Sequence, residues 1–220
     1  ELNFHDLYGG ISWQIASGHN LDINTLVTSD YFKFSDEFGY DWTNRVRSLK
    51  YRGVLGENIS VTALFADGNF NNAFFDPEGL DAAQVDNGMR YQQGKLSGTW
   101  ANEELAINFG AEAIRYAGKD ETISPYTQAS PIQAEVVGKE QGLEVSGFAS
   151  LEWELGEKTG LVAGVRYSSY RQLGPDTVYQ YLENAPITEE NITGSEVRGS
   201  GSIANYSGWE PRFSLRHNLS

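Results

Sequence analysis

Residues 142–172 alternate between apolar and polar positions on both sides of a turn at Glu157 and Lys158. A period of two residues indicates β-strands, because successive side chains of a strand point to opposite faces. The apolar face carries Leu143, Val145, Gly147, Ala149, Leu151, Trp153 and Leu155, then Leu161, Ala163, Val165 and Tyr167. The other face carries Glu144, Ser146, Phe148, Ser150, Glu152 and Glu154, then Val162, Gly164, Arg166 and Ser168. The apolar face therefore packs on a second sheet in water, or it meets lipid while the polar face lines a lumen.

The same alternation recurs along the chain and predicts about nine strands. They lie near residues 10–17, 21–33, 44–56, 57–66, 89–101, 104–116, 142–155, 159–171 and 208–219. Several run to about a dozen residues, whereas strands of soluble sheets usually have about five or six. Tilted strands that cross a bilayer need roughly nine to eleven. Strand length therefore favours a membrane barrel over a soluble sandwich.

The connections between these strands fall into two alternating classes. Tight turns are expected at "SGHN", "LGEN", "ANEE" and "GEKT", and long stretches at 34–43, 67–88, 117–141 and 172–207. Consecutive connections of a meander lie at opposite ends, so all tight turns share one end. Outer-membrane barrels have this asymmetry. The predicted fold class is all-β: an antiparallel up-and-down meander, part of a transmembrane β-barrel with short periplasmic turns and long extracellular loops.

The apolar faces agree in most strands, and the strand at 89–101 is the exception. Its polar face carries Gln93, Lys95, Ser97 and Thr99, and its other face offers only Leu96 and Trp100. Either this face does not meet lipid, or the strand is tilted out of the apolar belt, the band of apolar side chains that the other strands are expected to present to lipid. An aromatic girdle is expected towards strand ends. Its candidates are Trp13, Tyr31, Trp153, Tyr167 and Trp209.

Composition and charge narrow the function classes. The chain is 40% apolar and 13% aromatic, which excludes a disordered protein. Its net charge of -14 argues against nucleic acid as a partner and against docking on an anionic lipid surface. It contains no cysteine, which excludes disulfides and thiolate metal sites. No run of about 18 apolar residues predicts a transmembrane helix, a test that does not detect transmembrane strands.

Several segments together resemble the barrel region of TonB-dependent outer-membrane receptors of the Bacteroidetes type. They are "YSGWEPRFSLRHNLS", "LVAGVRYSSYRQLGP", "FFDPEGLDAAQVDNGMRYQQGK", "INTLVTSDYFKFSDE" and "YDWTNRVRSLKY". The resemblance implies a barrel of about 22 strands closed by an N-terminal plug. It also implies import of a scarce nutrient, such as a siderophore, a glycan or a peptide, with energy delivered by TonB.

The sequence matches only part of such a receptor. It has no recognisable plug, TonB box or terminal aromatic residue, begins without a signal peptide and ends at Ser220 in a predicted strand. Residues 1–220 are therefore expected to form a partial transmembrane barrel, truncated at both ends and localised in the cell outer membrane. The implied partners are outer-membrane lipid, the plug and remaining strands, and TonB through the N-terminal part. A surface lipoprotein that covers the barrel is a further candidate partner.

The polar faces supply the candidate lumen-facing residues. Arg212 and Arg216 alternate onto the face of Glu210, opposite Trp209 and Pro211. In a lumen they are expected to pair with carboxylates on neighbouring strands, such as those of Glu144 and Glu152, or with the plug. Arg166 has the same interpretation. Structural pairing is favoured over direct contact with substrate, and Pro211 suits a strand end or a bulge.

Aromatic and acidic residues gather in the expected extracellular loops. The candidate loop contacts are Trp42, Phe74, Phe75, Asp76 and Tyr91. They could close over a ligand or hold a calcium ion. The alternative is a loop packed on its own side chains with a proline turn at residues 76–77. The spacing does not match a D-x-D-x-D-G calcium loop, so calcium is a minor expectation and no other cofactor is expected.

Catalytic motifs are absent from the sequence. No Ser/His/Asp constellation is suggested for its three histidines, and it has neither H-E-x-x-H nor a glycine-rich phosphate loop. The chain is therefore not expected to be an enzyme. Two alternatives to a receptor remain: a soluble or cell-surface β-rich binding module, and a passive porin. A plug domain would distinguish the receptor from the porin.

Overall fold

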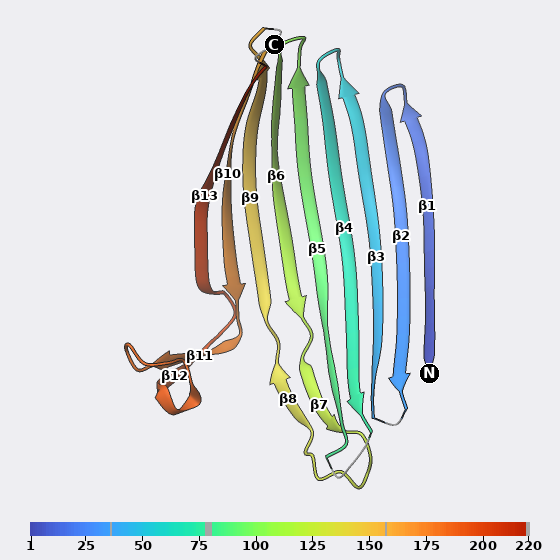
Figure 1. Ribbon diagram of the computed structural model, residues 1–220, viewed down its shortest axis with the longest axis vertical. Helices are drawn as coiled ribbons and strands as arrows, with labels where there is room; N and C mark the ends of the chain where they lie inside the picture. Colours follow the sequence, from blue (N-terminus) through green and yellow to red (C-terminus); the bar gives the residue numbers. More distant parts are fainter. Residues whose placement is uncertain (36, 78–80, 157, 219–220) are drawn as a thin grey trace.

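The computed structural model describes residues 1–35, 37–77, 81–156 and 158–218, with the side chain of Val137 also outside the description. Nine strands form one continuous path (Figure 1). They are β1 (Leu2–Ala16), β2 (His19–Phe34), β3 (Phe38–Leu55), β4 (Ile59–Asp76), β5 (Ala83–Ala101), β6 (Leu105–Gly118), β9 (Gln141–Glu154), β10 (Thr159–Leu173) and β13 (Ser202–His217). Every neighbouring pair is antiparallel, so the described strands form the expected meander.

Two hairpins project from this path at the end opposite the tight turns (Figure 1). The strands β7 (Glu121–Pro125) and β8 (Glu135–Gly138) pair with each other, and β7 also pairs with the start of β5. The strands β11 (Asp176–Tyr181) and β12 (Ile192–Arg198) form a separate two-stranded sheet, with the short 3-10 helix η1 (Glu189–Asn191) between them. The expected long connections at 117–141 and 172–207 therefore contain structure of their own.

The four tight turns lie at one end, as expected (Figure 1). Gly18, Gly56 and Gly156 have φ angles of 73°, 72° and 81° in three of these turns. Such positive values favour glycine, because a Cβ atom is strained there. In the fourth turn, the side-chain oxygen of Asn102 accepts a hydrogen bond of 2.8 Å from the backbone N–H of Leu105. Glu157, expected in the last turn, lies outside the described residues.

At the other end, two connections are shorter than the sequence predicts. Residues 34–43 and 67–88 were expected to be loops, but β2 continues to Phe34, β3 begins at Phe38 and β4 continues to Asp76. At these positions the outer face becomes polar and aromatic side chains lie on the inner face, so the apolar alternation of the preceding strand ends, whereas backbone pairing continues. Residues 78–80 of the second connection lie outside the described part of the chain.

The strand β5 is fully paired within the sheet, although its sequence has too few apolar residues on one face to predict a lipid-facing strand. It pairs with β4 over 83–100 and with β6 over 89–101. Its apolar face has little side-chain volume, and the ring of Phe109 on β6 fills the gap. An added Cβ at Gly98 would lie 2.7 Å from that ring, so only glycine admits this approach. The apolar surface is continuous because a neighbouring strand supplies what β5 lacks.

The wall is a single layer with an exposed apolar face. Among the described residues, the buried side chains are those of Ala66, Phe75, Ala82, Ile114 and Ser146, and the other buried residues are glycines. One row across the apolar face consists of Gly53, Val61, Gly98, Phe109, Ala149, Val165 and Pro211. A two-sheet sandwich would bury such a row against a second sheet. The described sheet therefore contradicts the sandwich alternative. Pro211 was expected at a strand end or a bulge, but it lies within β13 in continuous register with β10.

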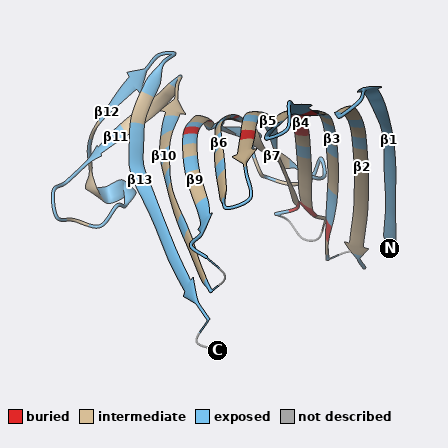
Figure 2. Cartoon of the chain, turned by 90° about the horizontal axis from the view of Figure 1, so that it is seen from above, coloured by how far each residue is buried: buried red, intermediate tan, exposed pale blue. Residues whose placement is uncertain are grey.

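Figure 2 shows the sheet as a curved wall, seen from above. Neighbouring residues reveal which face is concave, because side chains crowd on a concave face and spread on a convex one. Along β6, the odd-numbered residues of the apolar face from Ile107 to Arg115 are all exposed, whereas the even-numbered residues of the polar face from Asn108 to Tyr116 are half-buried or buried. The polar face is therefore the inner one. Strands β1 and β13 are the two edges and do not pair with each other in the described sheet, so the wall is incomplete. No helix in the described residues is both long and apolar enough to span a membrane.

Two valines on β10 provide a matched test of the faces. Val165 lies on the outer face and Val162 on the inner face, and they are 41% and 43% exposed. In the full-length protein folded into phospholipid vesicles, Val165→Lys should lower the free energy of unfolding by about 2 to 4 kcal/mol, because lysine at mid-bilayer loses its hydration. Val162→Lys should cost much less, because the inner face is polar. Urea titration measures both, and equal costs would contradict the assignment of the faces.

Candidate functional site

The strand register assembles polar side chains into continuous rows across the inner face. One row runs from β1 to β13 through Ser12, Asp22, Lys50, Leu64, Lys95, Glu112, Ser146, Ser168 and Gly208. Near its start, the carboxylate of Asp22 accepts hydrogen bonds from Ser12 at 2.6 Å and from Arg52 at 2.9 Å. Charged and hydroxyl groups thus line the inside of the wall.

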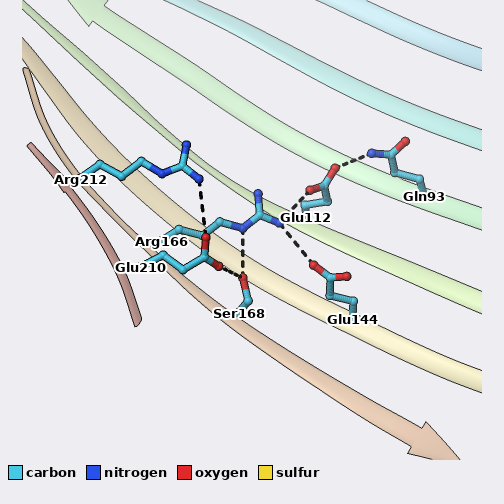
Figure 3. Close-up of polar contacts among 7 residues, drawn as sticks. All are labelled: Gln93, Glu112, Glu144, Arg166, Ser168, Glu210 and Arg212. Atoms are coloured by element: carbon cyan, nitrogen blue, oxygen red, sulfur yellow. Dashed lines mark hydrogen bonds and ion pairs between the residues drawn. The ribbon is translucent and has the colours of Figure 1, made fainter. Parts of the chain in front are cut away.

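Arg166 is the centre of the largest polar network (Figure 3). Its guanidinium crosses from β10 over β9 and lies 3.4 Å from the carboxylates of Glu112 on β6 and Glu144 on β9. Glu112 also accepts a hydrogen bond from the side chain of Gln93 on β5. The Nε of Arg166 donates to the hydroxyl of Ser168 at 3.1 Å. This Arg166 network therefore joins four strands through side chains alone.

The network continues to the edge strand β13. The hydroxyl of Ser168 donates to Glu210 at 3.0 Å, and Arg212 lies 3.7 Å from the same carboxylate group (Figure 3). Glu112 is the most enclosed of the charged groups, with a side chain only 11% exposed. A carboxylate in that position is costly unless it is paired. The Arg166 network is therefore a structural element of the wall.

All five candidate lumen residues lie on this inner face. Arg212 and Arg216 were expected to pair with carboxylates on neighbouring strands, such as those of Glu144 and Glu152, or with the plug. Arg212 instead pairs with Glu210 of its own strand, two positions along the same face. Arg216 reaches Glu154 at 3.4 Å across Gly160, which has no side chain to separate them.

Glu144 and Glu152, the two expected partners, have other contacts. The carboxylate of Glu144 pairs with Arg166 on the adjacent strand. Glu152 accepts a hydrogen bond of 3.3 Å from the side-chain amide of Asn108. The register therefore selects partners that the alternation of single strands does not identify.

Five aromatic rings gather on the inner face at the end opposite the tight turns. We call this the aromatic patch: Phe32, Phe34, Phe38, Tyr40 and Phe74. The rings of Tyr40 and Phe74 are 5.0 Å apart, and those of Phe38 and Tyr40 are 6.1 Å apart. Phe34 and Tyr40 are exposed. Exposed rings grouped in this way offer a surface for the apolar or aromatic part of a ligand.

Sequence reasoning missed most of the aromatic patch, because it assigned residues 34–43 to a loop. Only Phe74 was among the candidate residues. The signal was present as aromatic residues at spacings of two, at Phe32 and Phe34 and again at Phe38 and Tyr40. That spacing places each pair on one face of a strand.

The expected loop contacts lie in strands, which corrects their location. Trp42 is in β3, Phe74 in β4 and Tyr91 in β5, and the register places all three on the inner face. Tyr91 packs against Tyr116 with ring centroids 5.7 Å apart. Asp76 is the last residue of β4. The strands continue past the last apolar residue of the outer face, so the end of the apolar pattern does not predict where a loop begins.

Phe75 points to the opposite face and is not placed for ligand contact. It is buried, and its ring stacks between Tyr31 at 5.9 Å and Tyr126 at 5.7 Å. Tyr126 belongs to the connection between β7 and β8. Phe75 therefore holds this connection against the outer face of the wall.

The described residues contain no group of three or more His, Cys, Asp or Glu side chains placed to hold a metal ion. The calcium expectation concerned the region 67–88, of which residues 78–80 lie outside the description. Calcium therefore stays a prediction.

Comparison with solved structures shows the fold. All of the chain superposes on the copper transporter OprC with a TM-score of 0.72 at 13% identity, covering 36% of that protein. The hemophore receptor HasR of Serratia marcescens matches 99% of the chain with a TM-score of 0.69 at 13% identity, over 34% of its own length. The ferric-catecholate import receptor Fiu of E. coli matches all of the chain with a TM-score of 0.62 at 11% identity, over 42% of its length.

The chain has the fold of a section of a TonB-dependent receptor barrel. This confirms the predicted fold class, a meander that forms part of a transmembrane barrel. The chain spans between 34% and 42% of these three structures. No family model and no curated protein sequence matches it.

The Arg166 network gives a prediction about stability. In the full-length protein folded in lipid vesicles, Arg166→Gln should lower the free energy of unfolding by about 1 to 3 kcal/mol, because the enclosed carboxylate of Glu112 loses its charged partner. Arg216→Gln is the control and should change little, because that pair is largely exposed. A double-mutant cycle of Arg166→Gln and Glu112→Gln, followed by urea titration, should show coupling. Independent effects of the two substitutions would contradict the network's role.

Proposed function

We propose that this chain is one wall of an outer-membrane TonB-dependent receptor that imports a scarce nutrient. The observation that carries the proposal is the one-sided wall, apolar outside and polar inside, in the fold of receptor barrels. An apolar outer face suits lipid, and a charged inner face suits a water-filled or plugged lumen. The tight turns face the periplasm and the opposite end faces the cell exterior.

The open edges support the presence of further strands in the full-length protein. Strands β1 and β13 each present unpaired backbone groups along one side of the described sheet. Such groups cannot stay exposed in hydrocarbon. Further strands therefore complete the barrel, and a plug fills it and contacts the inner charges. TonB acts through that plug region.

The proposed substrate class follows from the solved structures of similar fold. Their names describe a copper transporter, a hemophore receptor and a ferric-catecholate import receptor. The substrate is a siderophore, glycan, peptide or similar compound. The sequence segments that resemble Bacteroidetes receptors support that type, in which a surface lipoprotein can cover the barrel.

The aromatic patch is the part of the wall that a ligand meets first. It lies on the inner face at the extracellular end, beyond the Arg166 network. A ligand with rings or apolar faces packs there before it reaches the charged interior. Trp42 lies on the same face, two residues along β3 from Tyr40, and extends this surface.

An uptake assay tests the function. Cells that produce the full-length protein are offered a ferric siderophore, haem, a copper salt, an oligosaccharide and a peptide, with and without functional TonB. One class should accumulate, and only when TonB is functional. Uptake of many small solutes without TonB would indicate a porin, and no uptake of any compound would contradict the import function.

The aromatic patch can be tested in the same assay. Tyr40→Ala with Phe74→Ala should reduce uptake at least about tenfold, because the ligand loses its first contact surface. The matched control removes another ring pair, Tyr167 and Trp209 on the outer face, whose centroids are 4.8 Å apart. Uptake per folded molecule should stay near wild type in the control. Equal losses in both variants would contradict a role for the patch.

A further inference from the structure

Five arginines form a band on the outer face, directly beyond the apolar belt. We call them the arginine collar: Arg45, Arg47, Arg90, Arg115 and Arg171. Arg47, Arg115 and Arg171 lie in one row of residues across the wall, and Arg45 and Arg90 lie in the adjacent row. All five are exposed. Alternation and register thus bring together cations that are far apart in the sequence.

The collar contrasts with the charge of the whole chain. The protein has a net charge of -14, yet Asp67 is the only acidic residue in these two rows. Asp67 pairs with Arg90 at 2.9 Å. Within the described residues, the other four arginines have no ion pair. The collar is therefore a local band of positive charge on a protein whose net charge is negative. The net charge argues against binding of anionic lipid elsewhere on the surface, but not at the collar.

A groove of about 520 Å³ lies where the collar meets the belt. Its apolar side is formed by Ile23, Leu49 and Phe65, all of them exposed. Its polar side is formed by Arg47, Arg90, Asp67 and Gln92. The groove thus presents apolar surface towards the membrane interior and guanidinium groups towards the extracellular end.

Each half of the groove matches one half of an amphipathic anion. Acyl chains pack against apolar side chains, and guanidinium groups bind phosphate through paired N–H donors. Long cationic side chains also extend to a membrane surface without any specific partner, and lysine serves equally well for that. The two residue rows of the collar contain no lysine, although the chain has lysines elsewhere. The composition therefore favours phosphate recognition over a general surface anchor.

We propose that the arginine collar and its groove bind a phosphorylated lipid of the outer leaflet. Its phosphate lies against the unpaired guanidinium of Arg47, beside the ion pair of Arg90 with Asp67, and an acyl chain lies along Phe65 and Leu49. The other three arginines extend the band to further headgroups around the wall. This inference rests on the membrane location given in the proposed function.

The test compares a phosphorylated lipid with its unphosphorylated counterpart. Phosphatidic acid and diacylglycerol with identical acyl chains are added to the full-length protein in a neutral detergent, and the Tm is measured. Phosphatidic acid should raise the Tm, because a ligand of the folded state stabilises it, and diacylglycerol should not. Inorganic phosphate is added separately, and an equal rise in Tm would show a free-phosphate site and overturn the lipid assignment.

Variants locate the effect. Arg47→Gln with Arg90→Gln should weaken the response to phosphatidic acid at least about tenfold in lipid concentration. The control, Arg52→Gln with Arg216→Gln, removes two inner-face arginines and should leave the response intact. An unchanged response in the collar variant would overturn the proposal, as would binding of an acidic protein in place of lipid. If the protein inserts into vesicles but phosphatidic acid does not raise its Tm, only the lipid-binding proposal is refuted. If the protein does not insert into vesicles, the proposed function is refuted as well.

Discussion

Backbone hydrogen bonding between neighbouring antiparallel strands is the constraint on which the rest of this structure depends. The wall is one layer thick and buries few side chains, so packing of a core does not hold it together. Pairing instead runs the length of long strands, over 39–55 with 59–75 in β3 and β4. In hydrocarbon, no water competes for these groups. Because side chains alternate, the register that satisfies the backbone also sets both faces, and a slip of one residue would exchange them.

Each functional surface follows from that register. On the inner face, it places Arg166 within reach of carboxylates on two other strands, and it gathers the rings of β2, β3 and β4 into the aromatic patch. On the outer face, it aligns apolar side chains into a belt and places five arginines in two rows beyond it. One sheet thus carries a polar and aromatic inner surface, an apolar belt and a band of arginines, which we assign to a lumen, to lipid and to the membrane border.

The sequence predicts the features that depend on neighbours within one strand or one turn. Alternation around Val165 and the glycines of the tight turns identify the strands, the shared end of the turns and the two faces. Sequence reasoning fails where the pattern changes: beyond the belt the outer face is polar and the inner face is aromatic, so strand residues within 34–43 and 67–76 look like loops. Contacts between strands need the register, which explains why Arg216 pairs with Glu154 rather than with the expected carboxylates. The contact of the Phe109 ring with Gly98 is also between two strands, so it cannot be predicted without the register.

The central claim is that one face of this wall meets lipid and the other a lumen. Site-directed spin labelling tests it directly, since the chain has no cysteine and single cysteines can be introduced one at a time over residues 161–168 of β10. In the full-length protein reconstituted in lipid, collision with dissolved oxygen should be highest at Leu161, Ala163, Val165 and Tyr167, and low at the positions between them. A profile without a period of two, or one with its maxima at the even positions, would contradict the account.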